Sequence, residues 1–67
     1  MSVDTSINIL RMPEVEGRTG YKRPTIYKFI KAGSFPKQVP LGLRAVGWVE
    51  SEIDDWIQSK IDERGVA

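Results

Sequence analysis

Apolar residues recur at helical spacing in two parts of the chain. Ile26, Phe29 and Ile30 lie three and four positions apart, so they share one face of a helix that begins near Arg23. Gly33 ends this helix, because glycine accepts the left-handed conformation that commonly closes a helix. A second stripe predicts a later helix, and its apolar members are Ile53, Trp56, Ile57 and Ile61.

The segment before Arg23 predicts a turn and an earlier, shorter helix. Met12-Pro13 starts that helix, since proline suits the first helical turn, where its missing N–H would have no intrahelical acceptor. Thr19-Gly20 ends it, and Pro24 marks the first turn of the helix that follows. Two helices separated by so tight a turn indicate a helix-turn-helix, in which the second helix enters the major groove of DNA.

Short runs of residues that favour extended structure flank this pair of helices. Ile7 to Leu10 predicts a segment that joins a small sheet or lies across the core. Lys37 to Val49 predicts two short strands joined by a turn at Gly42 to Arg44. Pro40 places the first of these strands at a sheet edge, because proline cannot donate to a ladder. This hairpin is called the wing below.

The last helix is predicted to begin at Ser51, whose hydroxyl would cap it, with Asp54 completing a capping box and Gly65 marking the end. The elements together predict a mainly α domain with a small β-hairpin, a winged helix-turn-helix over residues 7–64. Residues 1–6 are short, polar and without periodicity, so a flexible N-terminus is expected.

Composition argues against enzymatic and metal-dependent functions. The chain has no Cys and no His, which removes disulfides, thiolate zinc sites and the commonest general base. Asp54 and Asp55 are adjacent on a predicted helix and point in different directions, so they form no converging carboxylate pair. There is no Gly-rich phosphate loop, and no apolar run approaches the roughly 20 residues that span a bilayer. We expect a cytoplasmic protein that is not an enzyme and needs no cofactor, metal or membrane.

The net charge of +1 conceals a strong segregation of charge along the chain. Residues 50–67 carry six acidic residues against two basic ones. Residues 17–49 contain no acidic residue and seven basic ones, namely Arg18, Lys22, Arg23, Lys28, Lys31, Lys37 and Arg44. A basic face opposite an acidic one would orient the molecule on a polyanion, and double-stranded DNA is the obvious partner.

Several residues are candidates for DNA contact, and each also has an ordinary structural explanation. Lys28 and Lys31 suit a solvated helix face as well as a phosphate contact, and Tyr27 suits a half-buried core position as well as a hydroxyl donor. Arg44 is either a solvated turn residue or a wing residue that reaches the backbone or minor groove. We assign Phe29, Trp48 and Trp56 to the core. The full candidate set is Lys22, Arg23, Thr25, Tyr27, Lys28, Lys31, Lys37 and Arg44.

Several motifs in this order resemble the AlpA family of small phage-type regulators. They are Thr25-Ile26-Tyr27, the Gly33 to Pro36 connection, Leu41-Gly42 with Arg44, and Trp48 to Ile53 with Trp56. The resemblance covers Ile9 to about Ile61 and implies an excisionase-like, MerR-like winged-helix fold. Family members usually carry a serine that caps the second helix where this chain has Lys22, and a small polar residue at the position of Pro24. The serine cap is therefore expected to be lost here, at a cost on the order of 1 kcal/mol.

The resemblance implies a sequence-specific transcriptional regulator of a prophage or integrated element, controlling integrase or excision genes. An excisionase that bends DNA and recruits an integrase is an alternative on the same architecture. A small protein-binding inhibitor module is a second alternative, from a different functional class. The first two hypotheses suggest an integrase or RNA polymerase as protein partner, and oligomerisation on DNA fits both of them.

Overall fold

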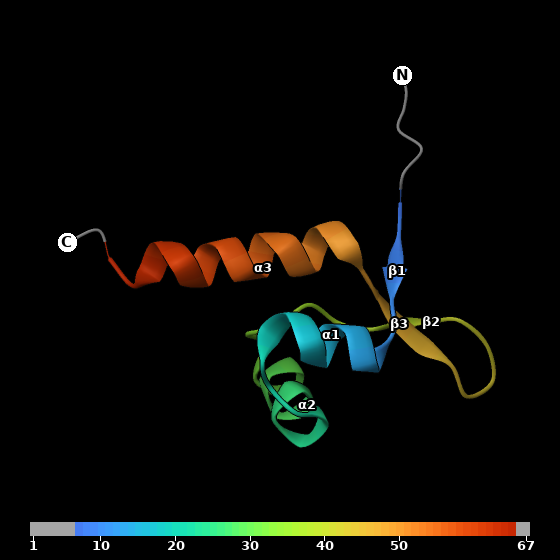
Figure 1. Cartoon of the computed structure of the whole chain (residues 1–67). Coiled ribbons are helices and arrows are strands. Elements are labelled where there is room, and N and C mark those ends of the chain that lie inside the picture. Colours follow the sequence, from blue (N-terminus) through green and yellow to red (C-terminus); the bar gives the residue numbers. More distant parts are fainter. Residues whose placement is uncertain (1–6, 66–67) are drawn as a thin grey trace.

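The computed structural model describes residues 7–65, so the predicted flexible segment 1–6 lies outside the described residues. Three helices and a small antiparallel sheet make up the domain, which confirms the predicted fold class (Figure 1). In chain order the elements are β1 (Ile9–Leu10), α1 (Met12–Thr19), α2 (Arg23–Ala32), β2 (Val39–Pro40), β3 (Val46–Val49) and α3 (Glu50–Glu63).

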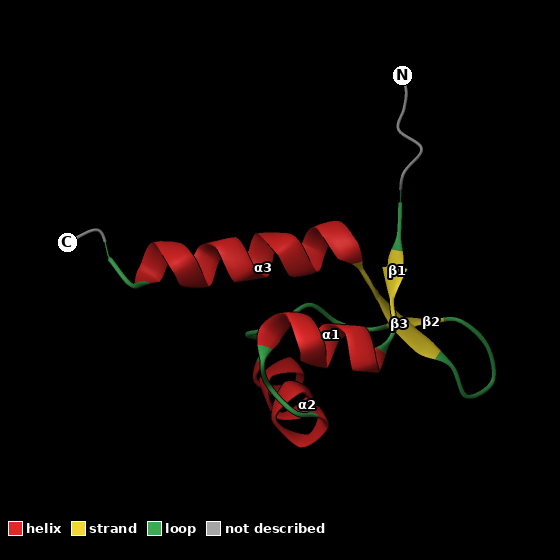
Figure 2. Ribbon diagram, viewed as in Figure 1, coloured by secondary structure: helices red, strands yellow, loops and turns green. Residues whose placement is uncertain are grey.

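The sheet is built around β3, which pairs antiparallel with β1 on one side and β2 on the other (Figure 2). Leu10 lies opposite Trp48, and Pro40 lies opposite Val46 on the edge strand, as predicted for a proline. The wing loop between β2 and β3 is closed by the N–H of Leu41, which donates to the Ala45 carbonyl at 2.7 Å. The predicted extended segment before α1 is therefore a sheet strand.

Two of the three glycines predicted to end helices, Gly20 and Gly33, occupy the C-cap position, and the third, Gly65, follows the Arg64 cap of α3 with a φ of 112°. Gly20 and Gly33 have φ angles of 81° and 80°, in the left-handed region where a side chain would be strained. Their N–H groups donate to the carbonyls of Glu16 and Ile30, at 2.8 and 3.0 Å. The turn between α1 and α2 thus follows from local chemistry, as the sequence predicts.

The core lies where the helices meet the sheet. It includes or contacts the three aromatic residues that the sequence assigns to it, which confirms that assignment. Trp48 is fully buried, and Trp56 and Phe29 are half-buried against the core. The indole N–H of Trp48 donates to the Pro36 carbonyl at 3.0 Å, and that of Trp56 donates to the Ser34 carbonyl at 2.6 Å. The buried apolar residues are Leu10, Val15, Ile26, Phe35, Trp48 and Ile53.

The predicted start of α3 at Ser51 is wrong. The helix begins at Glu50, directly after β3, and its N-cap Val49 makes no side-chain bond. The backbone N–H of Glu50, the first of the helix, donates to the Asn8 carbonyl at 2.8 Å, so the chain beside β1 fixes the start of α3 one residue before Ser51. Asp54 does not complete a capping box; its carboxylate binds Arg18.

The apolar stripe of α3 is not buried along its whole length. Ile53 is fully buried, whereas Ile61 is 43% exposed. Figure 1 shows the C-terminal end of α3 extending beyond α1, which explains why the last apolar residue lacks full cover.

Candidate nucleic-acid interface

The start of α2 is fixed by α1. Lys22 occupies the N-cap position and makes no side-chain capping bond, in agreement with the predicted loss of a serine cap. The carboxylate of Glu16 takes over part of this function, because its Oε2 accepts a hydrogen bond from the Arg23 backbone N–H at 2.8 Å. A carboxylate at this position also complements the positive end of the helix dipole. The start of α2, the candidate DNA-reading helix that is predicted to enter the major groove, is therefore held in place by α1.

A groove of about 250 Å³ lies between α2 and the wing. Three arginines from three separate segments line it: Arg11 precedes α1, Arg23 begins α2, and Arg44 belongs to the wing loop. All three residues are exposed. The other lining residues are Met12, Pro13, Tyr27 and Val46. The fold thus gathers, on one side of the molecule, positive charge that the sequence distributes over more than thirty positions.

Arg11 is a member of this groove that sequence reasoning missed. Its Nε donates to the Val46 carbonyl on β3 at 3.0 Å, which holds the side chain against the sheet. A guanidinium has five donor hydrogens, so the outer nitrogens remain able to bind an acceptor such as phosphate. The available signal was its place directly after the strand predicted to join the sheet.

Arg23 and Tyr27 form a stacked pair on α2. The Arg23 guanidinium carbon lies 5.4 Å from the centre of the Tyr27 ring, within the range of a cation–π contact. The Tyr27 ring is half-buried and lies 6.5 Å from the Trp48 ring, centre to centre. The ring of Tyr27 therefore occupies the half-buried core position that the sequence predicts as one of two explanations for this residue. Contact between its hydroxyl and DNA stays a prediction.

The remaining candidate residues do not line the groove. Lys22, Lys28 and Lys31 are exposed on α2 or at its cap, and Lys37 is exposed on the connection before β2. Thr25 is half-buried in the first turn of α2. The exposed lysines add positive charge outside the arginine groove.

Arg18, one of the seven basic residues in the segment 17–49 that lacks acidic residues, belongs to a different surface. Arg18 donates to Glu50 at 2.6 Å and to Asp54 at 2.5 Å, so it joins α1 to α3. Both bonds are partly exposed, and their contribution to stability is modest. The other six cations of segment 17–49 form no ion pair with a described residue.

Two other kinds of functional feature, metal-binding clusters and membrane-spanning helices, are absent from the described residues. Residues 7–65 contain no cluster of three or more His, Cys, Asp or Glu side chains arranged to hold a metal ion. Within the same residues, no helix combines the length and apolar character needed to cross a membrane.

Comparison with known proteins gives concordant matches over most of the chain. Residues 8–61 match the family described as "Prophage CP4-57 regulatory protein (AlpA)". The chain is 39% identical over 66 residues to the "DNA-binding transcriptional activator AlpA" of Escherichia coli strain K12, covering 90% of this chain and 94% of that protein. It is also 43% identical over 60 residues to "Uncharacterized protein ORF88" of Enterobacteria phage P4, covering 90% of this chain and 68% of that protein.

Proposed function

Because the chain belongs to the AlpA family of prophage regulatory proteins, we propose that it acts as a DNA-binding transcriptional regulator of the AlpA type. The observation that carries this proposal is the groove lined by Arg11, Arg23 and Arg44. Cations from the segment before α1, from α2 and from the wing face a single groove, which suits a continuous polyanionic backbone better than a small ligand.

In the proposed mode of binding, α2 enters the major groove of double-stranded DNA. Arg23 lies at the N-terminal end of α2, the end from which helices of this motif contact base edges. Lys22, Lys28 and Lys31 are exposed on or next to the same helix and would bind phosphates beside the groove. The wing carries Arg44 toward the adjacent backbone or minor groove.

The proposed genetic role is control of integrase or excision genes of a prophage or integrated element. The same interface would serve an excisionase that recruits an integrase, and RNA polymerase is the corresponding partner of an activator. A promoter fusion assayed with and without the protein, next to an excision assay with the cognate integrase, distinguishes the two roles. A purely protein-binding inhibitor would bind no duplex, so the arginine groove favours the DNA-binding alternatives.

The direct test is the salt dependence of binding to duplexes from the element that carries the gene. If about five phosphates are neutralised, the slope of log K against log salt should lie near −4 to −5. Affinity that does not change with salt, or no affinity for any such duplex, refutes the proposal.

Arg23 is the proposed base-reading residue. A bidentate guanidinium on guanine is worth about 1–3 kcal/mol of discrimination, so Arg23→Ala should weaken binding and flatten the preference at one base pair. Lys60→Ala, which removes one exposed cation from α3, is the matched control and should leave the preference unchanged. An equal loss on every sequence would reassign Arg23 to the DNA backbone.

A further inference from the structure

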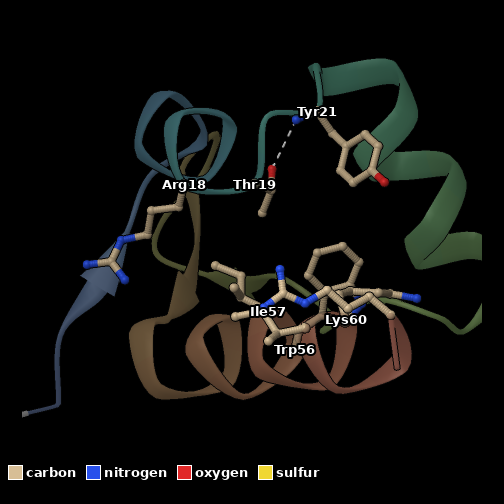
Figure 3. A pocket seen from close by; sticks show the side chains of 8 residues that line it. Arg18, Thr19, Tyr21, Trp56, Ile57 and Lys60 are labelled. Carbon is tan, nitrogen blue, oxygen red and sulfur yellow. Dashed lines mark hydrogen bonds between the residues drawn. The ribbon is translucent and has the colours of Figure 1, made fainter. Parts of the chain in front are cut away.

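A second groove, of about 310 Å³, lies between the α1–α2 turn and the C-terminal half of α3. Figure 3 shows Trp56, Ile57 and Lys60 of α3 on the side that faces the turn carrying Thr19 and Tyr21. The groove shares no lining residue with the arginine groove. It is therefore a separate surface, and the proposed DNA contact does not account for it.

The groove leaves apolar side chains open to solvent. Ile61 is 43% exposed and Tyr21 is 39% exposed, and both line the groove together with the half-buried Ile57 and Trp56. Isolated exposed apolar residues are ordinary, but several that line one groove are typical of an interaction site.

One face of α3 beside this groove carries an ordered set of charges. Asp54, Ile57, Ile61 and Arg64 follow one another at spacings of three, four and three, so they form one stripe along the helix. The stripe has an acid at one end, two isoleucines in the middle and a base at the other end. Ile57, Ile61 and Arg64 line the groove directly.

This stripe is complementary to itself when two copies run antiparallel. Asp54 and Arg64 lie at equal distances along the helix on either side of residue 59, and so do Ile57 and Ile61. A two-fold axis at that level therefore places each Asp54 opposite Arg64 of the other copy, and each Ile57 opposite Ile61. A parallel arrangement would instead bring like charges together.

The two charged residues are available for such contacts. The Asp54 side chain remains 55% exposed while it binds Arg18, and its second oxygen has no hydrogen-bond donor within residues 7–65. Arg64 is exposed, and its side chain makes no ion pair with another described residue. Arg18, which lines the same groove, binds the Asp54 carboxylate.

We propose that a second copy of this chain docks on the α3 stripe, forming an antiparallel two-fold dimer centred at the level of residue 59. Ile57 and Ile61 form its apolar centre, and two Asp54–Arg64 pairs close its ends. An interface of one short helix per copy is small, so the Kd is expected in the micromolar range or weaker. This proposal is independent of the proposed DNA-binding function.

Sedimentation equilibrium of the full chain, from about 1 μM to 1 mM, should show a reversible monomer–dimer equilibrium. Ile61→Asp should weaken the dimer about tenfold or more, because it places a charge at the apolar centre. Leu43→Asp is the matched control, since Leu43 is an apolar wing residue that is fully exposed. A wild-type chain that stays monomeric throughout overturns the proposal, and so does a dimer that both variants weaken equally.

A charge exchange tests the orientation of the two copies. Arg64→Asp and Asp54→Arg should each weaken self-association by roughly tenfold, since each places like charges opposite one another. A mixture of the two variants should form a heterodimer, in which both end pairs are complementary again. Circular dichroism checks that Asp54→Arg remains folded, and Glu50 still binds Arg18 in that variant. Failure of the folded mixture to associate more tightly than either variant alone overturns the antiparallel arrangement.

Discussion

The start of α2 offers the sharpest test of how this fold holds its reading helix. Glu16→Ala removes the carboxylate that accepts the Arg23 N–H at 2.8 Å, while Lys22 supplies no replacement. Loss of a helix N-cap costs about 0.5–2 kcal/mol, and the charged acceptor favours the upper half of that range. Because Glu16 is half-buried rather than buried, we expect a loss of about 1–1.5 kcal/mol.

Urea unfolding followed by circular dichroism measures this loss. With an m value of about 1 kcal/mol/M for so small a domain, the midpoint should fall by roughly 1 M urea. Asp55→Ala removes an exposed acid from α3 that forms no ion pair with another described residue, and it should leave the midpoint nearly unchanged. Equal midpoints for the two variants would show that Glu16 does not stabilise α2.

A second substitution checks the mechanism. Lys22→Ser in the Glu16→Ala background adds a side-chain acceptor at the N-cap for the Thr25 N–H, which otherwise donates only to the Lys22 carbonyl at 3.0 Å, and it leaves the Arg23 N–H without its carboxylate. It should recover about half of the lost stability, on the scale measured for serine caps. If the serine gives no gain in the variant that lacks Glu16, the loss did not arise from an uncapped helix.

Three further predictions concern the sheet and the wing. Gly47→Ala should destabilise the fold by about 1–3 kcal/mol, because a Cβ there would lie 2.9 Å from the Leu10 carbonyl oxygen and collide with a β1 side chain. Thermal unfolding measures this loss, and an unchanged melting temperature would contradict the tight β1–β3 contact. Trp48→Phe should lower the free energy of unfolding in urea by about 2–4 kcal/mol, because it leaves a cavity in the core and removes the indole N–H that donates to the Pro36 carbonyl. A loss below about 1 kcal/mol would contradict this account of the Trp48 site. Arg44→Ala should leave the stability of the fold unchanged. If the Arg44 side chain contacts phosphate, the variant should lower the salt slope of DNA binding by about one unit; if the side chain enters the minor groove, the variant should weaken binding more on A·T-rich than on G·C-rich flanks. Wild-type affinity on both kinds of flank would exclude the wing from the interface.

Local signals in the sequence predict most of the helical part of this fold. Gly20 and Gly33 end their helices, and Pro24 lies in the first turn of α2, because each signal depends only on the backbone of its own segment. Pro40 likewise identifies an edge strand without knowledge of the partner. These predictions succeed because the physical cause lies within a few residues.

The errors arise where a distant segment supplies the partner. Ser51 was predicted to cap α3, but the helix begins at Glu50, whose N–H donates to the carbonyl of Asn8, more than forty positions earlier. Arg18 belongs to the basic block by sequence, yet its partners lie on α3. The candidate interface shows the same limit, since Arg11 joins it only through the Val46 carbonyl on β3. No pattern of neighbouring residues reports such pairings.

The pairing of β1 with β3 has a consequence for the lifetime of the folded state. Ile9 and Val49 are forty positions apart, whereas Pro40 and Val46 are six apart and α1 and α2 are joined by a short turn. Contacts that close long loops form late, so the helix pair and the wing should assemble before β1 joins. Contacts that are absent from the folding transition state chiefly govern the unfolding rate. A strand of two residues would thus have little influence on how fast this protein folds, and a large influence on how long each molecule stays folded.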